Sequence, residues 1–201
     1  MTVQFGLLGP LAMWSDGEPV VVSGAKRRGL LAYLLAHPGA PQPIDRIVDA
    51  LWGSDGSASA ERTVQTYVSQ LRKLFAGHGP ILARRAGGYV LEIDSGALDA
   101  SRFEAAIAAA TGLLDRDQRL ALLEEALLLW RGTPLDEFAG QEWADDRARQ
   151  WVRMHVLAHQ LRAQALLDGG RHQDALPTLE QLVTAHPLHE PFWSGCAVTS
   201  C

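Results

Sequence analysis

Residues 60–91, AERTVQTYVSQLRKLFAGHGPILARRAGGYVL, decide the fold that we expect for this chain. The first half carries apolar residues at helical spacing, and the second half is two β-like runs around a Gly-Gly pair, which permits the positive φ of a hairpin turn. From Arg62 to Leu91 the stretch holds five arginines and lysines and no acidic residue. A helix followed by a basic hairpin is the layout of a helix that enters a DNA groove beside a basic wing. We therefore expect a nucleic-acid-binding surface here.

Length and charge indicate two unlike halves. The chain has 201 residues, of which 47% are hydrophobic, and a formal net charge of -5. Residues 1–100 hold 9 basic and 9 acidic residues, whereas residues 101–201 hold 9 basic and 14 acidic ones. This length allows two domains of roughly 100 residues each. The negative total does not exclude DNA, because salt screens charges beyond about 10 Å and the local face decides.

The sequence lacks the signals of export and of membrane insertion. Its start has no basic flank and long apolar core, and no apolar run approaches the roughly 18 residues of a spanning helix. The two cysteines, Cys196 and Cys201, cannot build a disulfide framework or a four-thiolate zinc site. We predict a cytoplasmic, nucleoid-associated protein that does not contact a membrane.

The N-terminal half reads as a small antiparallel sheet followed by helices. Residues 3–14 precede an Asp16-Gly17 turn of hairpin type, and residues 20–22 form a β-branched run that we predict as the next strand. Apolar spacing predicts helices over 26–36 and 44–51. The polar stretch 53–59 has no hydrophobic face and is predicted as a loop.

A third helix, about 60–75, is predicted to carry the binding surface. Val64, Val68, Leu71 and Phe75 share one stripe and are expected to pack inward. The remaining face is rich in donors, acceptors and cations, which can bond to base edges and phosphates. We assign base-edge contacts to Gln65, Thr66 and Ser69, and phosphate or guanine contacts to Arg62, Arg72 and Lys73.

The hairpin of residues 81–85 and 89–93 is predicted to be the wing. Arg84 and Arg85 lie near its tip, where a guanidinium can enter the minor groove. Tyr89 is assigned to the same surface, with cross-strand packing as an equally good interpretation. The cations of residues 26–28 either reach the DNA backbone or only aid solubility, and the sequence leaves both open.

From residue 101 onward helical patterns replace strand signals. Apolar spacing predicts helices over about 103–114, 120–130, 142–167 and 172–185, joined by short turns. The spacing of Gly170, Ala175, Leu179 and Pro187 is similar to the second half of a tetratricopeptide repeat.

Five ordered motifs carry a resemblance to a known family. They are ALWGSDGSASAERTVQTYVSQLRKLF, ILARRAGGYVLEI, DASRFEAAI, LLEEALLLWRGTPLDEF and GRHQDALPTLEQLVTAHPLHEPFW, within residues 3–193. Together they resemble the Streptomyces antibiotic regulatory protein family. The resemblance implies an α+β OmpR-type winged helix-turn-helix domain at 1–95, an all-α tetratricopeptide-like activation domain at 99–193, and a tail at 194–201. Family members usually continue for one or two helices after the position of Pro187, and whether this activation domain is complete stays open.

The resemblance also implies a function and partners. Family members activate secondary-metabolite (antibiotic) gene clusters by binding direct repeats in double-stranded DNA and recruiting RNA polymerase holoenzyme. By this resemblance the loop containing Gly53, Ser54, Asp55 and Gly56 faces polymerase. A homodimer is an open possibility.

The sequence leaves two alternatives to activation of transcription. The first is a helical-repeat adaptor that binds proteins and not DNA, since helical repeats often bind peptides and the C-terminal half is acidic. The second is an enzyme, but no nucleophile elbow or phosphate loop occurs. His155 and His159 have chelating spacing without an evident third ligand, so we predict no metal, no cofactor and no catalytic residue.

Overall fold

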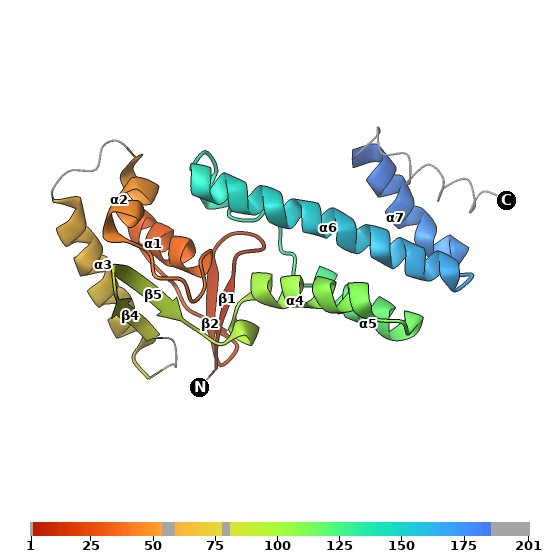
Figure 1. Ribbon diagram of the computed structural model, residues 1–201, viewed down its shortest axis with the longest axis horizontal. Coiled ribbons are helices and arrows are strands. Elements are labelled where there is room, and N and C mark those ends of the chain that lie inside the picture. Colours follow the sequence, from red (N-terminus) through yellow and green to blue (C-terminus); the bar gives the residue numbers. More distant parts are fainter. Residues whose placement is uncertain (1, 54–58, 78–80, 186–201) are drawn as a thin grey trace. The chain divides into compact units, whose positions relative to one another are not determined.

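The computed structural model describes residues 2–53, 59–77 and 81–185 (Figure 1). Contacts divide the chain into two compact units. The described parts of 1–102 and 131–150 form the first unit, and those of 103–130 and 151–201 form the second. The first contains the strands and three helices of a winged-helix fold, and the second is helical, which confirms the predicted fold class.

A three-stranded antiparallel sheet begins the first unit. It consists of β1 (Val3–Gly6), β2 (Ala12–Ser15) and β3 (Glu18–Pro19). Asp16 and Gly17 both adopt positive φ, so the hairpin turn is as predicted.

The prediction that residues 20–22 form the third strand is wrong. The two-residue turn pairs Glu18 and Pro19 directly with β2, and beyond them only Val20 still donates its N–H to Met13 O, at 2.8 Å. The chain then leaves the sheet, with Val21 81% exposed and Val22 buried. A β-branched run favours a strand locally, but pairing ends where the chain must turn toward the first helix.

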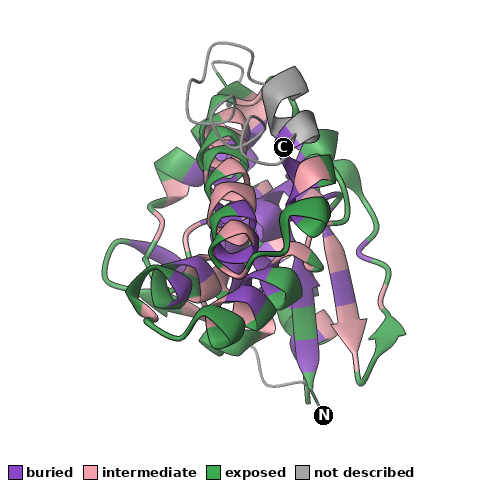
Figure 2. Ribbon diagram, turned by 90° about the vertical axis from the view of Figure 1, so that its right-hand side faces the viewer, coloured by how far each residue is buried: buried purple, intermediate pink, exposed green. Residues whose placement is uncertain are grey.

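Three helices and a hairpin complete the winged-helix fold. The helices are α1 (Ala25–Leu35), α2 (Ile44–Trp52) and α3 (Ala60–Phe75), and the hairpin pairs β4 (Ile81–Arg85) with β5 (Gly88–Glu92). All five elements begin and end close to the predicted residues. Phe5 of β1 meets Phe75 of α3 edge to face, with ring centroids 6.0 Å apart. Buried and exposed residues alternate along the helices, as amphipathic spacing requires (Figure 2).

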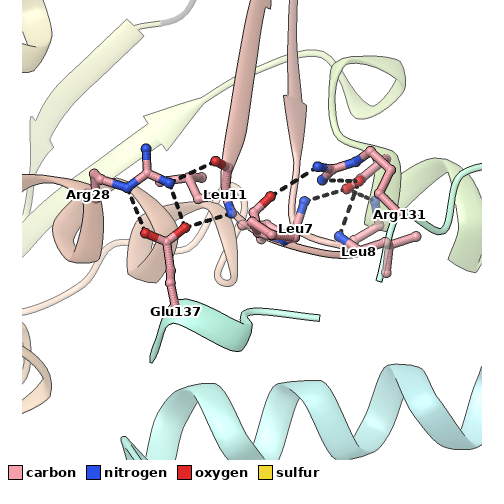
Figure 3. A network of polar contacts seen from close by, with 9 residues as sticks. Leu7, Leu8, Leu11, Arg28, Arg131 and Glu137 are labelled. Atoms are coloured by element: carbon pink, nitrogen blue, oxygen red, sulfur yellow. Dashed lines mark hydrogen bonds and ion pairs between the residues drawn. The ribbon is translucent and has the colours of Figure 1, made fainter. Parts of the chain in front are cut away.

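A buried carboxylate closes the loop that follows β1. Asp99 is 7% exposed and accepts backbone N–H bonds from Leu7 at 2.8 Å and Leu8 at 3.1 Å, and Arg131 Nη2 lies 3.3 Å away (Figure 3). Burial raises the pKa of Asp99 above its ordinary value, although the two N–H groups and Arg131 oppose the shift. Asp99 thus provides partners for backbone groups that would otherwise be buried without hydrogen bonds.

A second carboxylate, that of Glu137, also accepts a backbone N–H of the segment that follows β1. Glu137 lies in the 3-10 turn η3 (Asp136–Phe138) and accepts the Leu11 N–H at 2.8 Å. It also pairs with Arg28 of α1 through two bonds, of 2.6 Å and 2.5 Å (Figure 3). Residues 131–138 therefore belong to the hydrogen-bond network of the winged-helix unit although they follow it by many residues in sequence.

Helices form the second unit. They are most of α4 (Asp99–Gly112), α5 (Arg116–Leu127), the later part of α6 (Glu142–Asp168) and α7 (His172–Ala185). Asp115 caps α5 by accepting the Gln118 N–H at 2.8 Å. Small residues in the core, including Ala163 and Ala175, allow close packing of α6 and α7 around Leu166. In the described part of the chain no helix has both the length and the apolar character to cross a membrane.

Candidate nucleic-acid interface

The two faces of α3 differ sharply in exposure. Val64, Val68, Leu71 and Phe75 are buried, so the apolar stripe packs inward as predicted. The other face is open to solvent. The exposed residues of α3 are Glu61, Arg62, Gln65, Thr66, Ser69, Gln70, Arg72 and Lys73. Every α3 residue that the sequence assigned to DNA binding therefore lies on one accessible surface.

Hydrogen bonds within the first unit limit what two of these residues can offer. Thr66 Oγ1 donates to Arg62 O at 3.0 Å, which leaves the hydroxyl lone pairs as acceptors and the methyl group for apolar contact. Arg72 Nε donates to Leu82 O at 2.7 Å and so ties α3 to β4. Arg72 therefore positions the wing against the helix, and only its remaining N–H groups are available for a ligand.

The wing presents its two arginines differently. Arg85 forms an ion pair with Glu92 across the hairpin, at 2.5 Å from Nη2 to Oε1. Arg84 lies over the Tyr89 ring, 5.9 Å from its centroid, and among the described residues it has no carboxylate partner. Arg84 is thus the more available cation at the wing tip.

Tyr89 is a packing residue. Its side chain is 5% exposed, and its backbone exchanges two hydrogen bonds with Gln42, of 2.7 Å and 2.9 Å. This burial supports the interpretation that Tyr89 braces the hairpin, and it leaves little of the ring for a phosphate. Sequence reasoning did not identify Gln42, because a single bridge between segments far apart in sequence has no local signal.

Of the loop residues that the resemblance directs toward polymerase, only Gly53 lies among the described residues. Gly53 follows α2 with a positive φ of 61°, which favours glycine. Ser54, Asp55 and Gly56 lie outside the described residues. No group of three or more histidine, cysteine, aspartate or glutamate side chains within the described ranges is arranged to hold a metal ion.

His155 and His159 of α6 belong to an aromatic cluster in the second unit. The His155 ring stacks on Trp130, with centroids 3.9 Å apart, and His159 meets His155 edge to face at 4.6 Å. Burial, assisted by the nearby His159, lowers the pKa of His155 to about 4. Both residues therefore act as neutral packing groups at neutral pH.

Comparison with known proteins agrees with this geometry. The family model described as "Transcriptional regulatory protein, C terminal" matches residues 17–91, and the one described as "Bacterial transcriptional activator domain" matches residues 98–198. The regulatory protein DnrI of Streptomyces peucetius is 34% identical over 206 residues, which cover 96% of this chain and 75% of DnrI. The chain belongs to the Streptomyces antibiotic regulatory protein family.

Other regulatory proteins are similar to the chain along almost its whole length. The transcriptional regulatory protein EmbR of Mycobacterium tuberculosis is 36% identical over 201 residues, covering 96% of this chain and 51% of EmbR. The regulatory protein AfsR of Streptomyces coelicolor is 35% identical over 94% of this chain and 19% of AfsR. The chain thus spans about half the length of EmbR. The names of these relatives describe them as regulatory proteins.

A solved structure supports the fold assignment. The structure of Mycobacterium tuberculosis EmbR in complex with a low-affinity phosphopeptide matches with a TM-score of 0.89 at 35% sequence identity. The match covers 98% of this chain and 54% of the EmbR chain.

Proposed function

We propose that this member of the Streptomyces antibiotic regulatory protein family is a sequence-specific DNA-binding activator of transcription. The observation that carries the proposal is the exposed face of α3. The opposite face of the helix is apolar and packs into the core, so the polar and cationic side chains point to solvent. The neighbouring wing adds Arg84, which has no carboxylate partner among the described residues. A polyanionic duplex is the partner that matches such a surface.

We assign different tasks to different residues of this surface. Gln65, Thr66 and Ser69 are proposed to contact base edges in the major groove, where each base pair presents a distinct pattern of donors and acceptors. Arg62 and Lys73 are proposed to contact phosphates, which fix register without reading sequence. Arg84 and, more weakly, the paired Arg85 are proposed to reach the minor groove from the wing.

Family membership supports the remaining parts of the proposal. By resemblance, the target is a promoter with direct repeats in a secondary-metabolite gene cluster. The helical unit, together with the loop that begins at Gly53, is proposed to contact RNA polymerase holoenzyme or a second copy of the chain. The names of the relatives, which describe them as regulatory proteins, agree with this assignment.

A salt titration with matched variants tests the proposal. Arg62, Arg72, Lys73 and Arg84 have no carboxylate partner among the described residues. If each neutralises one phosphate, log K should fall against log salt with a slope of about -4. Lys73→Ala should weaken binding to every sequence and reduce the slope by about 1, whereas Thr66→Ala should change the preference among sequences at an unchanged slope. Footprinting across the surrounding gene cluster would supply the operator.

The adaptor hypothesis makes the opposite prediction. If the full chain bound a random duplex and promoter fragments of the surrounding gene cluster equally poorly, with no dependence on salt, the DNA-binding proposal would be wrong. Capture of a defined protein by the same chain under those conditions would then favour the adaptor.

A further inference from the structure

Three cations open α1, and their side chains take three different directions. Lys26 Nζ donates to Leu51 O and lies over the Trp52 ring, 5.5 Å from its centroid. Arg28 is occupied by Glu137 and by the carbonyl of Leu11, at 2.9 Å. Neither side chain is therefore available beside the exposed face of α3.

Arg27 alone among the three points to α3. Its Nη1 donates to Oε1 of Gln70 at 3.0 Å, and Gln70 lies on the exposed face between Thr66 and Lys73. Its other bonds hold the guanidinium in place. Nε donates to Ser23 O at 2.8 Å, and Nη2 donates to Ser23 Oγ at 2.6 Å.

The charge of Arg27 is not neutralised. The ion pairs of the described residues include none with Arg27, and its three hydrogen-bond acceptors are a carbonyl, a hydroxyl and an amide oxygen. A guanidinium has five N–H donors, so about two remain for a ligand. Because its orientation is already fixed by Ser23 and Gln70, little side-chain entropy is lost when it binds.

We infer that Arg27 is a phosphate-binding residue of the DNA surface, and that Gln70 is the positioning residue that couples it to α3. This inference rests on the proposed function of α3. A guanidinium beside a helix in the major groove is suited to a backbone phosphate, whose oxygens accept charge-assisted hydrogen bonds. Bonding to Arg27 also orients Gln70: its Oε1 accepts, because a guanidinium has no acceptor, and its amide N–H groups are left for the duplex.

The experiment compares adjacent cations of one helix in the full chain. Binding to a random-sequence duplex of about 30 base pairs is titrated from about 50 to 200 mM salt, where each phosphate contact contributes about 0.9 to the slope. Arg27→Ala and Arg27→Gln should each flatten the slope by about 0.9 and weaken binding on the order of tenfold at the lowest salt. Arg27→Lys should keep the slope. Lys26→Ala removes the same charge one residue away and should leave the slope unchanged.

Gln70→Ala tests the positioning of Arg27 without removing its charge. It leaves both bonds to Ser23 in place, so the salt slope should stay at the wild-type value while affinity falls about threefold through looser positioning. Thermal unfolding of each variant identifies any loss of folded protein.

The outcomes distinguish this inference from the proposed function. If Lys73→Ala flattens the slope but Arg27→Ala and Arg27→Gln behave like Lys26→Ala, Arg27 does not bind phosphate and only this inference is wrong. If the wild-type chain shows no salt-dependent binding, both the proposed function and the role of Arg27 are wrong.

Discussion

At the scale of single residues, the close approach of two backbone segments explains why Gly88 cannot be replaced by a residue with a Cβ atom. Gly88 is the first residue of β5 and lies against the segment that contains Gln42. A Cβ atom placed at Gly88 would overlap the carbonyl of Gln42. That carbonyl accepts the Tyr89 N–H, so the glycine permits the bridge that fixes the wing. The Gly-Gly pair therefore serves both the turn and the attachment of the hairpin.

Gly88→Ala should destabilise the protein by about 2 kcal/mol, because the methyl group forces the bridge apart in a packed region. Urea unfolding of the full chain measures the change. Gly96→Ala is the matched control: Gly96 has open space around its Cβ position, and the free energy of unfolding should change by less than about 0.5 kcal/mol. Equal stability of the two variants would show that the close approach at Gly88 is unimportant.

At the scale of elements, η3 stabilises the loop after β1 and the start of α1 through the hydrogen bonds of Glu137. Glu137 provides oxygens both to Leu11 N–H and to Arg28, whose side chain is 26% exposed. Arg28 also has its pKa raised, chiefly by the bond to Glu137, so the guanidinium stays charged at any physiological pH. Removing the carboxylate would leave the half-buried guanidinium of Arg28 without its ion-pair partner and the Leu11 N–H without its acceptor.

Glu137→Ala should lower the free energy of unfolding by about 2 kcal/mol, the cost of leaving such groups unsatisfied. Asp146→Ala breaks the pair with Arg149, whose two side chains are both 62% exposed, and should have an effect of less than about 1 kcal/mol. Chemical denaturation of both variants at one salt concentration makes the comparison. If Glu137→Ala and Asp146→Ala lowered the free energy of unfolding by similar amounts, η3 would not stabilise the first unit in this way.

At the scale of the whole molecule, the two compact units contain different titrating groups, so acid should affect them differently. Asp99, in the first unit, has a raised pKa, and its folded form therefore binds a proton more readily than the unfolded chain. His155, in the second unit, has its pKa lowered from 6.5 to about 4, so it binds a proton less readily when folded. The histidine contribution to stability is thus present above pH 6.5 and is lost as the pH falls toward 4.

His155→Phe should reduce this loss of stability between pH 6.5 and pH 4, because the ring keeps its place against Trp130 and no longer titrates. Urea midpoints at several pH values within this window provide the measurement. If His155→Phe and the wild type lost stability in parallel, burial of His155 would not be the cause.

Local spacing was enough to predict much of this molecule. The inward stripe of α3, the turn at Asp16-Gly17 and the wing hairpin depend on neighbours a few residues apart, so the sequence contains their physical cause. The same periodicity predicts that the polar residues of α3 are exposed to solvent. The domain boundaries and the contacts with DNA and polymerase stay predictions.

Only the tertiary structure decided which groups meet across long separations. Arg27 and Gln70 are 43 residues apart in sequence, and Arg28 and Glu137 are 109 apart, so no periodic pattern predicts that one cation reaches α3 while its neighbour is paired. The backbone bridge between Gln42 and Tyr89 likewise joins segments far apart in sequence. A sequence specifies which face of an element is apolar, but the identity of each polar partner follows from how the packed elements bring distant side chains together.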